Sequence, residues 1–264
     1  MKKLLVHADD FGISPSVNDA IVALGEQKRL SGTAVMTIFE ESRYKADELM
    51  AIENFAIGLH ITLTDQPLCH YNSSLINAAG HAYGVKDVIQ KATKNQLDVQ
   101  DLEAEIRMQL DNFYTIFKRY PDYFDGHHHV QLLKPVRKAL YNVTSALGIN
   151  VYIRSANMPY AFGLSPKTLV LRGLNKDMQT DIQEYGWQSN TYFAGSYGKE
   201  GIRAYFDKIL SKQKDDLLMM VHPGFVDDIL ASRDPFTDGR IAEYNYLNSD
   251  AFSQTLQKYG YYVG

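Results

Sequence analysis

Cysteine is almost absent from this sequence, and long apolar runs are missing altogether. Cys69 is the single cysteine among 264 residues, which excludes an intramolecular disulfide framework and a zinc site built from thiolates, and favours a reducing compartment. No window approaches the roughly 18 apolar residues that a membrane-spanning helix needs. Lys2 and Lys3 resemble the start of a signal peptide, but the apolar run after them, residues 4–6, is too short for a signal core. We therefore expect a cytoplasmic protein without a membrane partner.

The chain also lacks a stripe of basic residues, a low-complexity segment and an internal repeat. Its net charge of -4 argues against nucleic acid as a partner, because nucleic acid is held by a concentration of positive charge. The 45% of apolar and 22% of charged residues are ordinary for a globular protein and exclude a disordered or fibrous chain. At this length we expect one domain over residues 1–264, with a homodimer as the default assembly.

Short apolar runs alternate with stretches of helical periodicity along the chain. This alternation is typical of βαβ units around a parallel sheet. Seven or eight strands favour a closed or nearly closed, TIM-barrel-like (β/α) barrel. An open nucleotide-binding sheet would carry a glycine-rich first turn, and residues 8–12 lack it. The expected strands are 3–7, 32–39, 55–61, 123–129, 216–221 and a short terminal strand at 261–263, and residues 151–153, 168–171 and 191–193 are further candidates. The expected helices are 14–28, 41–52, 101–120, 135–147 and 249–258. Residues 63–85 form a long βα loop, of a length that is typical of lids and binding loops.

Aspartate and histidine side chains follow several of the expected strands. Asp9 and Asp10 come after the first apolar run, His60 stands at the end of the third strand, and the triplet 127–129 is His-His-His. The carboxyl ends of barrel strands open onto one face, so these residues should converge there. Carboxylate and imidazole are ligands of divalent metals, and a set of three with an open position suits a catalytic ion. The sequence therefore predicts a metal site at this face.

The individual residues leave alternatives open. Asp9 and Asp10 could form a polar turn with a helix cap, and His60 alone could be a hydrogen-bonded core histidine. If both carboxylates are functional, one can bind the ion while the other acts as a base. Alternation along an extended strand would place His127 and His129 on one face, so at most two of the triplet would enter the barrel mouth. His222 ends the strand 216–221 on the same rim and suits a general acid.

Four segments together resemble the YdjC-like carbohydrate deacetylases, a family that includes the chitooligosaccharide (diacetylchitobiose) deacetylases. They are residues 8–12 (ADDFG), 58–64 (GLHITLT), 124–130 (FDGHHHV) and 221–225 (VHPGF), in matching order and spacing. The resemblance extends to residues 238–249 and so covers nearly the whole chain.

The resemblance implies a barrel with a metal at the strand ends, and removal of an N-acetyl group from an amino sugar such as diacetylchitobiose, with or without a phosphate. It implies that Asp10, His60 and His127 bind the ion, with Asp9 as the catalytic base and His222 as the acid. Magnesium and zinc are the first candidates for the ion, since this ligand set serves several metals.

The sequence departs from the family pattern at the triplet and at one arginine. His128 stands in place of a glutamine, and Gln131 in place of a further histidine, which leaves the choice of ligand between His127 and His129 open. His129 and Arg154 are candidates for substrate contact, and Arg154 is alternatively a partner of the base.

Two other functions remain open from the sequence. One is hydrolysis of another amide or of a phosphate ester on the same barrel, which would favour more arginine and lysine on the loops than Arg154, Arg172 and Arg233. The other is a non-catalytic sugar-binding protein, for which a spare base at Asp9 and a spare acid at His222 would have no purpose.

Overall fold

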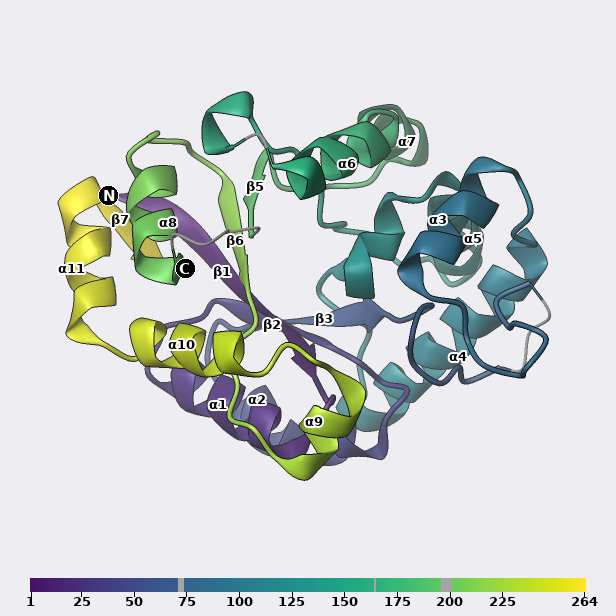
Figure 1. Ribbon diagram of the computed structural model, residues 1–264, viewed down its shortest axis with the longest axis horizontal. Coiled ribbons are helices and arrows are strands. Elements are labelled where there is room, and N and C mark those ends of the chain that lie inside the picture. Colours follow the sequence, from purple (N-terminus) through teal and green to yellow (C-terminus); the bar gives the residue numbers. More distant parts are fainter. Residues whose placement is uncertain (71–73, 164, 196–200) are drawn as a thin grey trace.

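A curled sheet of parallel strands forms the centre of the protein (Figure 1). The computed structural model describes residues 1–70, 74–163, 165–195 and 201–264. The hydrogen-bonded order of the strands is β4-β3-β2-β1-β6-β5, and β7 pairs with the start of β1. The strands are β1 (Lys2–Phe11), β2 (Gly32–Val35), β3 (Ala56–Ile61), β4 (Phe124–Gly126), β5 (Tyr192–Ala194), β6 (Leu217–Val221) and β7 (Tyr261–Val263).

The two edges of this sheet are joined by the extended residues 151–157. Phe124 of β4 bridges Ile153, and the neighbouring Tyr152 bridges Gln188, in both cases with parallel direction. The amide of Phe193 in β5 donates to the carbonyl of Asn157 over 2.9 Å. The two edges of the curled sheet are therefore linked through isolated bridges and one backbone hydrogen bond, and the prediction of a closed or nearly closed barrel is confirmed.

Helices lie around the sheet and supply the crossovers that parallel strands require (Figure 1). Ser14 begins the first of them by accepting a hydrogen bond from the amide of Val17, and Pro15 occupies the first helical position, as the sequence predicts. No helix of the described residues is long and apolar enough to cross a membrane. The helices are α1 (Pro15–Glu26), α2 (Ala46–Ala51), α3 (Val85–Thr93), α4 (Val99–Phe117), α5 (Lys134–Ala146), α6 (Pro166–Asn175), α7 (Met178–Tyr185), α8 (Gly201–Leu210), α9 (Asp228–Arg233), α10 (Asp238–Leu247) and α11 (Asp250–Tyr259), with short 3-10 turns η1 (Glu40–Arg43), η2 (His127–Leu132) and η3 (Tyr160–Phe162).

The middle strands are buried on both faces. All five residues of β6 are buried, and in β1 burial is continuous from Val6 to Phe11. A strand covered on both sides is expected to contain a continuous apolar run, here residues 4–6 of β1 and residues 217–221 of β6, which is why these strands can be predicted from the sequence. The buried polar residues of β1, which are His7, Asp9 and Asp10, lie in its carboxyl half, and this is the end at which the site lies.

Two of the expected elements differ from the structure because of local backbone chemistry. Residues 168–171, expected as a strand, lie inside α6, where Ser165 caps the helix by accepting from the amide of Thr168 and Pro166 follows it. The expected helix 41–52 is broken into η1 and α2 because Lys45 adopts a left-handed φ of 63°.

A third difference affects the histidine triplet. The expected strand 123–129 ends at Gly126, and His127–Leu132 form η2. His128 and His129 have left-handed φ values of 54° and 61°, so the chain coils immediately after the strand. The alternation expected for an extended segment is therefore wrong at these residues.

Candidate metal and catalytic site

A cavity of about 610 Å³ opens at the carboxyl ends of the strands. Its volume lies within the range of roughly 300–1,000 Å³ found for small-molecule sites. The predicted polar residues meet on one side of it, and helices α3 and α6 supply apolar walls. The residues that line it are Asp9, Asp10, His60, Val85, Lys86, Ile89, Gly126, His127, His128, His129, Val170, Leu171, Leu174, Gly195, Met220, His222, Asp234, Phe236 and Glu243.

The carboxyl end of β1 directs two adjacent carboxylates into this cavity. In a regular strand Asp9 and Asp10 would point to opposite faces. Here the pairing of β1 with β2 shifts register between Ala8 and Phe11, and Asp10 has a left-handed φ of 71°. This irregularity brings both side chains to the cavity, as their candidate roles require.

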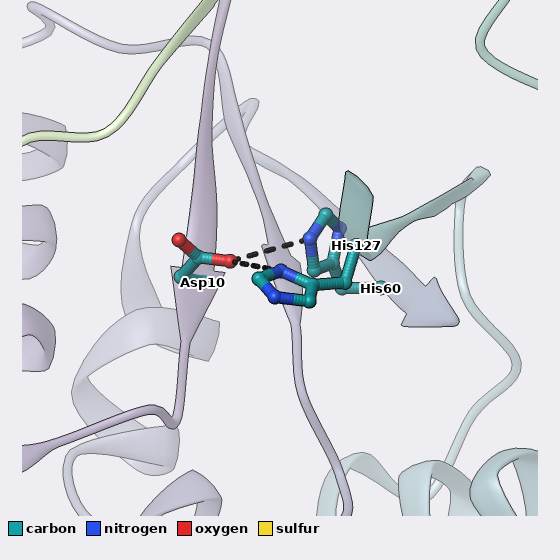
Figure 2. A group of neighbouring side chains, drawn as sticks. All are labelled: Asp10, His60 and His127. Atoms are coloured by element: carbon teal, nitrogen blue, oxygen red, sulfur yellow. Dashed lines mark ion pairs between the residues drawn. The ribbon is translucent and has the colours of Figure 1, made fainter. Parts of the chain in front are cut away.

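Asp10, His60 and His127 direct their polar atoms toward one point (Figure 2). The Oδ1 atom of Asp10 lies 3.3 Å from Nε2 of His60 and 3.4 Å from Nδ1 of His127. The ligand atoms of all three residues lie within 4.8 Å of one another, and the three residues are buried. Oδ1 of Asp10 has no hydrogen-bond partner, which is costly for a buried carboxylate oxygen unless a cation satisfies it. One carboxylate and two imidazoles therefore fit a divalent ion such as zinc.

Asp125 orients the imidazole of His60. Its Oδ1 lies 2.6 Å from Nδ1 of His60; because a carboxylate can only accept, Nδ1 carries the hydrogen and Nε2 faces Asp10. A carboxylate behind a histidine is the usual support for a metal ligand. Burial would lower the pKa of His60, but Asp125, Asp9 and Asp10 together raise it to about 10. The surroundings thus favour positive charge at this point, and a proton or a divalent cation can supply it.

Each of the two adjacent aspartates is paired with its own buried arginine. Arg154 holds Asp9 with two contacts, NH1 to Oδ1 at 2.5 Å and NH2 to Oδ2 at 2.9 Å. Arg240 touches Asp10 only at Oδ2, over 2.6 Å, which leaves Oδ1 directed at the histidines. Burial would raise the pKa of Asp10, but Arg240 and the two imidazoles hold it well below its usual range. Asp10 is therefore a carboxylate with one oxygen available for an ion.

A second acidic grouping lies beside the first but is less suited to a metal. Asp9, His60 and Asp125 also lie within ligand distance of one another. The guanidinium of Arg154 occupies this space, however, because it contacts Asp125 at 2.8 Å as well as both oxygens of Asp9. An ion there would have to displace a buried positive charge.

All three histidines of the triplet line the cavity, which corrects the expectation that at most two would do so. The ring of His128 lies 3.9 Å from that of His127, and its Nδ1 is 2.9 Å from the hydroxyl of Thr64. Burial and the neighbouring His127 lower the pKa of His128 to about 4. His129 is buried, with its ring edge against Phe193. Of the three, only His127 belongs to a group of side chains with metal-ligand geometry among the described residues.

His222 lies on the rim next to Asp9. Its Nε2 is 4.0 Å from Oδ2 of Asp9, and its side chain is 26% exposed. Its backbone amide donates to the buried carboxylate of Glu243 from α10. The predicted base and acid are thus neighbours. Oδ2 of Asp9 is also 4.0 Å from Nε2 of His60, so Asp9 is close both to His222 and to the cluster of Asp10, His60 and His127.

Arg154 lies beneath the cavity and is not among the residues that line it. Its guanidinium contacts Asp9 and Asp125, which corresponds to the expected alternative of a partner of the base. Gln131, at the position of a histidine in the family pattern, is buried and donates to the carbonyl of Arg154 over 3.2 Å. This contact makes Gln131 part of the support of Arg154.

Sequence reasoning gave no role to Asp125 or Arg240. Asp125 stands directly before the triplet at the end of β4, so its position at a strand end was a usable signal. Arg240 is separated from Asp10 by 230 residues and lies in a helix. Nothing local in the sequence indicates that α10 directs this arginine toward β1.

The fold and the cluster define the class of the protein: a parallel α/β barrel with a buried Asp-His-His group at the carboxyl ends of its strands. The model of the YdjC-like protein family matches residues 3–258, and the chain belongs to that family. The resemblance found in the four sequence motifs is thereby confirmed.

Similar proteins cover nearly the whole chain. A chitooligosaccharide deacetylase of Proteus mirabilis (strain HI4320) is 27% identical over 268 residues, which span 99% of this chain and 96% of that protein. A carbohydrate deacetylase of Halalkalibacterium halodurans is 25% identical over 251 residues, spanning 93% and 94% of the two chains.

The fold is shared with solved structures. One from Enterococcus faecalis V583, provisionally described as a cellobiose-phosphate cleavage protein, superposes with a TM-score of 0.77 at 20% identity, over 100% of this chain and 97% of that one. The Xyl-CE4 domain of a multidomain xylanase from the hindgut metagenome of Trinervitermes trinervoides gives a TM-score of 0.52 at 10% identity, over 100% and 86%.

Proposed function

We propose that this protein is a metal-dependent carbohydrate deacetylase that removes an N-acetyl group from an amino sugar or short chitooligosaccharide and releases acetate. The observation that carries the proposal is the buried cluster of Asp10, His60 and His127 with Asp9 and His222 beside it. The names of the similar proteins, carbohydrate and chitooligosaccharide deacetylase, agree with this chemistry.

Asp10, His60 and His127 would hold the ion, for which zinc and magnesium are the first candidates. A bound divalent cation would polarise the acetamide carbonyl and make a nearby water molecule more acidic. Asp125 keeps the hydrogen of His60 on Nδ1, so that Nε2 can act as a ligand. Arg240 holds Oδ2 of Asp10 and leaves Oδ1 facing the two histidines, where it could bind an ion.

Asp9 would take the proton of the attacking water, and His222 would deliver a proton to the departing nitrogen. The amide C–N bond breaks, the water oxygen stays on the acetyl carbon, and the sugar leaves as an amine. Each carboxylate oxygen can accept two hydrogen bonds, so Oδ2 of Asp9 retains a site for water beside its contact with Arg154. We propose that Arg154 acts on the reaction through Asp9, by orienting it, and that His129 contributes to the substrate wall of the cavity.

Hydrolysis of a phosphate ester is less well supported. A phosphoryl group at the reacting position calls for free guanidinium or ammonium groups around it. Arg154 is paired with carboxylates, Arg172 donates to the carbonyls of Met158, Pro159 and Gly163, and Arg233 is bound to Glu41 and the carbonyl of Ile13. Lys86 is the sole lysine or arginine among the described residues that line the cavity.

The test is acetate release from diacetylchitobiose, with and without a phosphate on the sugar. Chelated protein and protein reloaded with zinc or with magnesium should be compared. Release that requires the metal supports the proposal and identifies the active ion. A protein that binds the metal but releases no acetate from any acetylated amino sugar would refute it.

A further inference from the structure

One aromatic side chain stands at the mouth of the cavity. Among the described residues that line it, Phe236 is the only phenylalanine, tyrosine or tryptophan. Phe236 is 40% exposed, so part of its ring is open to a ligand in the cavity. Val170 and Leu174 of α6 and Ile89 of α3 supply further apolar lining of the same cavity, so a ligand there can contact apolar side chains in addition to Phe236.

The turn that carries Phe236 is fixed by charged groups. Oδ1 of Asp234 accepts from the amide of Phe236 over 2.9 Å, and Nε of Arg240 donates to its carbonyl over 3.0 Å. Arg240 also joins Asp234 to Asp10. The aromatic ring is therefore attached, through one arginine, to a residue of the metal-type cluster, and its backbone has little freedom to move.

The ring itself fits over a glycine. A Cβ atom on Gly239 would lie 2.2 Å from Cζ of Phe236, too close for both to remain in place. The backbone of Gly239 does not have a positive φ, so glycine is not required there for its conformation. Its lack of a side chain leaves room for the ring at the cavity mouth.

Phe236 also lies next to the proposed catalytic residues His222 and Asp9. The centroid of its ring lies 5.9 Å from that of His222, with the planes at 75°, and Nε2 of His222 is 4.0 Å from Asp9. If His222 protonates the departing nitrogen, the sugar ring bonded to that nitrogen must lie on the same side of the cavity as Phe236.

We propose that Phe236 is the platform on which the sugar ring bearing the acetamide packs, and that it determines the preference for a sugar over a simple acetamide. This inference rests on the proposed function. One face of a pyranose presents C–H groups, and the face of an aromatic ring carries partial negative charge that attracts them. Covering Phe236 also removes apolar surface from water.

Two variants of the platform and one control test the proposal. Phe236→Ala removes the aromatic ring. Gly239→Ala keeps Phe236 but forces its ring to move, because the added Cβ would occupy the same space. Phe225→Ala is the matched control, because Phe225 is 38% exposed, packs against Tyr244 and does not line the cavity. Diacetylchitobiose binding should be measured by calorimetry in an Asp9→Asn background, which stops turnover, and acetate release should be measured with Asp9 intact.

We expect Phe236→Ala to weaken sugar binding about 10- to 100-fold, because the sugar loses its apolar contact with the exposed part of the ring. Phe236→Trp should restore binding, and Gly239→Ala should weaken it without lowering the melting temperature, since alanine is the better helix former. Zinc affinity should stay unchanged in all of them. Phe225→Ala should bind sugar like the parent protein.

The outcomes separate the two proposals. If the parent protein binds and deacetylates the sugar but Phe236→Ala binds it equally well, the platform is refuted and the deacetylase stands. Loss of zinc affinity together with sugar affinity in Phe236→Ala would also refute the platform, because the ring would then be structural support. A parent protein that neither binds nor deacetylates any acetylated sugar refutes both.

Discussion

Replacing Asp125 by asparagine should weaken metal binding, because Asp125 orients the imidazole of His60. Oδ1 of Asp125 accepts from Nδ1 of His60 at 2.6 Å, and Oδ2 lies 2.8 Å from NH1 of Arg154. Arginine has donors only, so the oxygen of an asparagine amide must face Arg154 and its NH2 group must face His60. Nδ1 of His60 must then accept, and the ring hydrogen moves to Nε2, which faces Asp10 at 3.3 Å. A nitrogen that carries this hydrogen cannot bind a cation.

The size of the effect follows from these contacts. Loss of a supporting partner typically lowers metal affinity about 10- to 100-fold, or about 1.4–2.7 kcal/mol. In Asp125→Ala no amide constrains His60, and the ring can still present Nε2 to the ion. The Asp125→Asn protein should therefore bind zinc more weakly than the Asp125→Ala protein, although asparagine is closer in shape to aspartate. This order of affinities depends on the hydrogen position of His60 and not on the loss of charge, which both variants share.

The assay is a calorimetric titration of zinc into chelated protein, together with the nitrogen chemical shifts of His60, which report the position of its hydrogen. Asp111→Asn is the control, because Asp111 is exposed on α4 and pairs with Arg107. It should bind zinc like the unchanged protein. If Asp125→Asn bound zinc as tightly as the unchanged protein, or more tightly than Asp125→Ala, the assigned support of His60 would be wrong.

Three further predictions follow from the same geometry. Asp9→Asn should still bind zinc but lose about 10²- to 10⁴-fold in turnover, since it removes a base, whereas His127→Ala should lose zinc binding. Calorimetry and acetate release measure the two properties. Loss of zinc by Asp9→Asn and its retention by His127→Ala would show that the assigned roles are wrong. Arg240→Met should lower the free energy of unfolding by about 3–5 kcal/mol by leaving Asp10 without its buried partner, and zinc should restore part of the loss in urea titrations; equal zinc stabilisation of both proteins would contradict this. Burial and Arg154 lower the pKa of His7 to about 3, against 6.5 when unfolded. The unfolded state then binds the extra proton, so stability should fall by up to about 1.4 kcal/mol per pH unit as pH drops from 6.5 toward 3. His7→Gln should flatten that slope in urea titrations at successive pH values, and an unchanged slope would remove His7 as the cause.

The sequence predicts the strands well where burial on both faces gives a continuous apolar run, as in β6 and in residues 4–6 of β1. It predicts the candidate site because parallel strands bring their carboxyl ends to one face, so that Asp10, His60 and His127 need only follow their strands. Both predictions rest on local patterns and one topological rule.

The errors arise where one residue overrides a pattern. Thr168–Leu171 reads as a strand by composition, but the Ser165-Pro166 cap starts a helix there. The triplet reads as extended until His128 adopts a left-handed backbone. Arg240 was missed for a different reason, since its contact with Asp10 depends on the packing of α10 against the barrel and leaves no trace in the neighbouring residues.

The two adjacent aspartates illustrate how one residue type can serve two purposes. Asp9 and Asp10 have the same side chain, lie near the end of the same strand and are equally buried, so composition cannot distinguish them. Arg154 occupies both oxygens of Asp9, whereas Arg240 occupies one oxygen of Asp10 and leaves the other without a hydrogen bond. A carboxylate with both oxygens paired to a guanidinium is poorly placed to bind an ion but is held in a fixed orientation beside His222. A carboxylate with one unsatisfied oxygen facing two imidazoles is placed to bind an ion. The division of labour that we propose is therefore set by the two arginines, whose contacts with the aspartates span 145 and 230 residues of sequence.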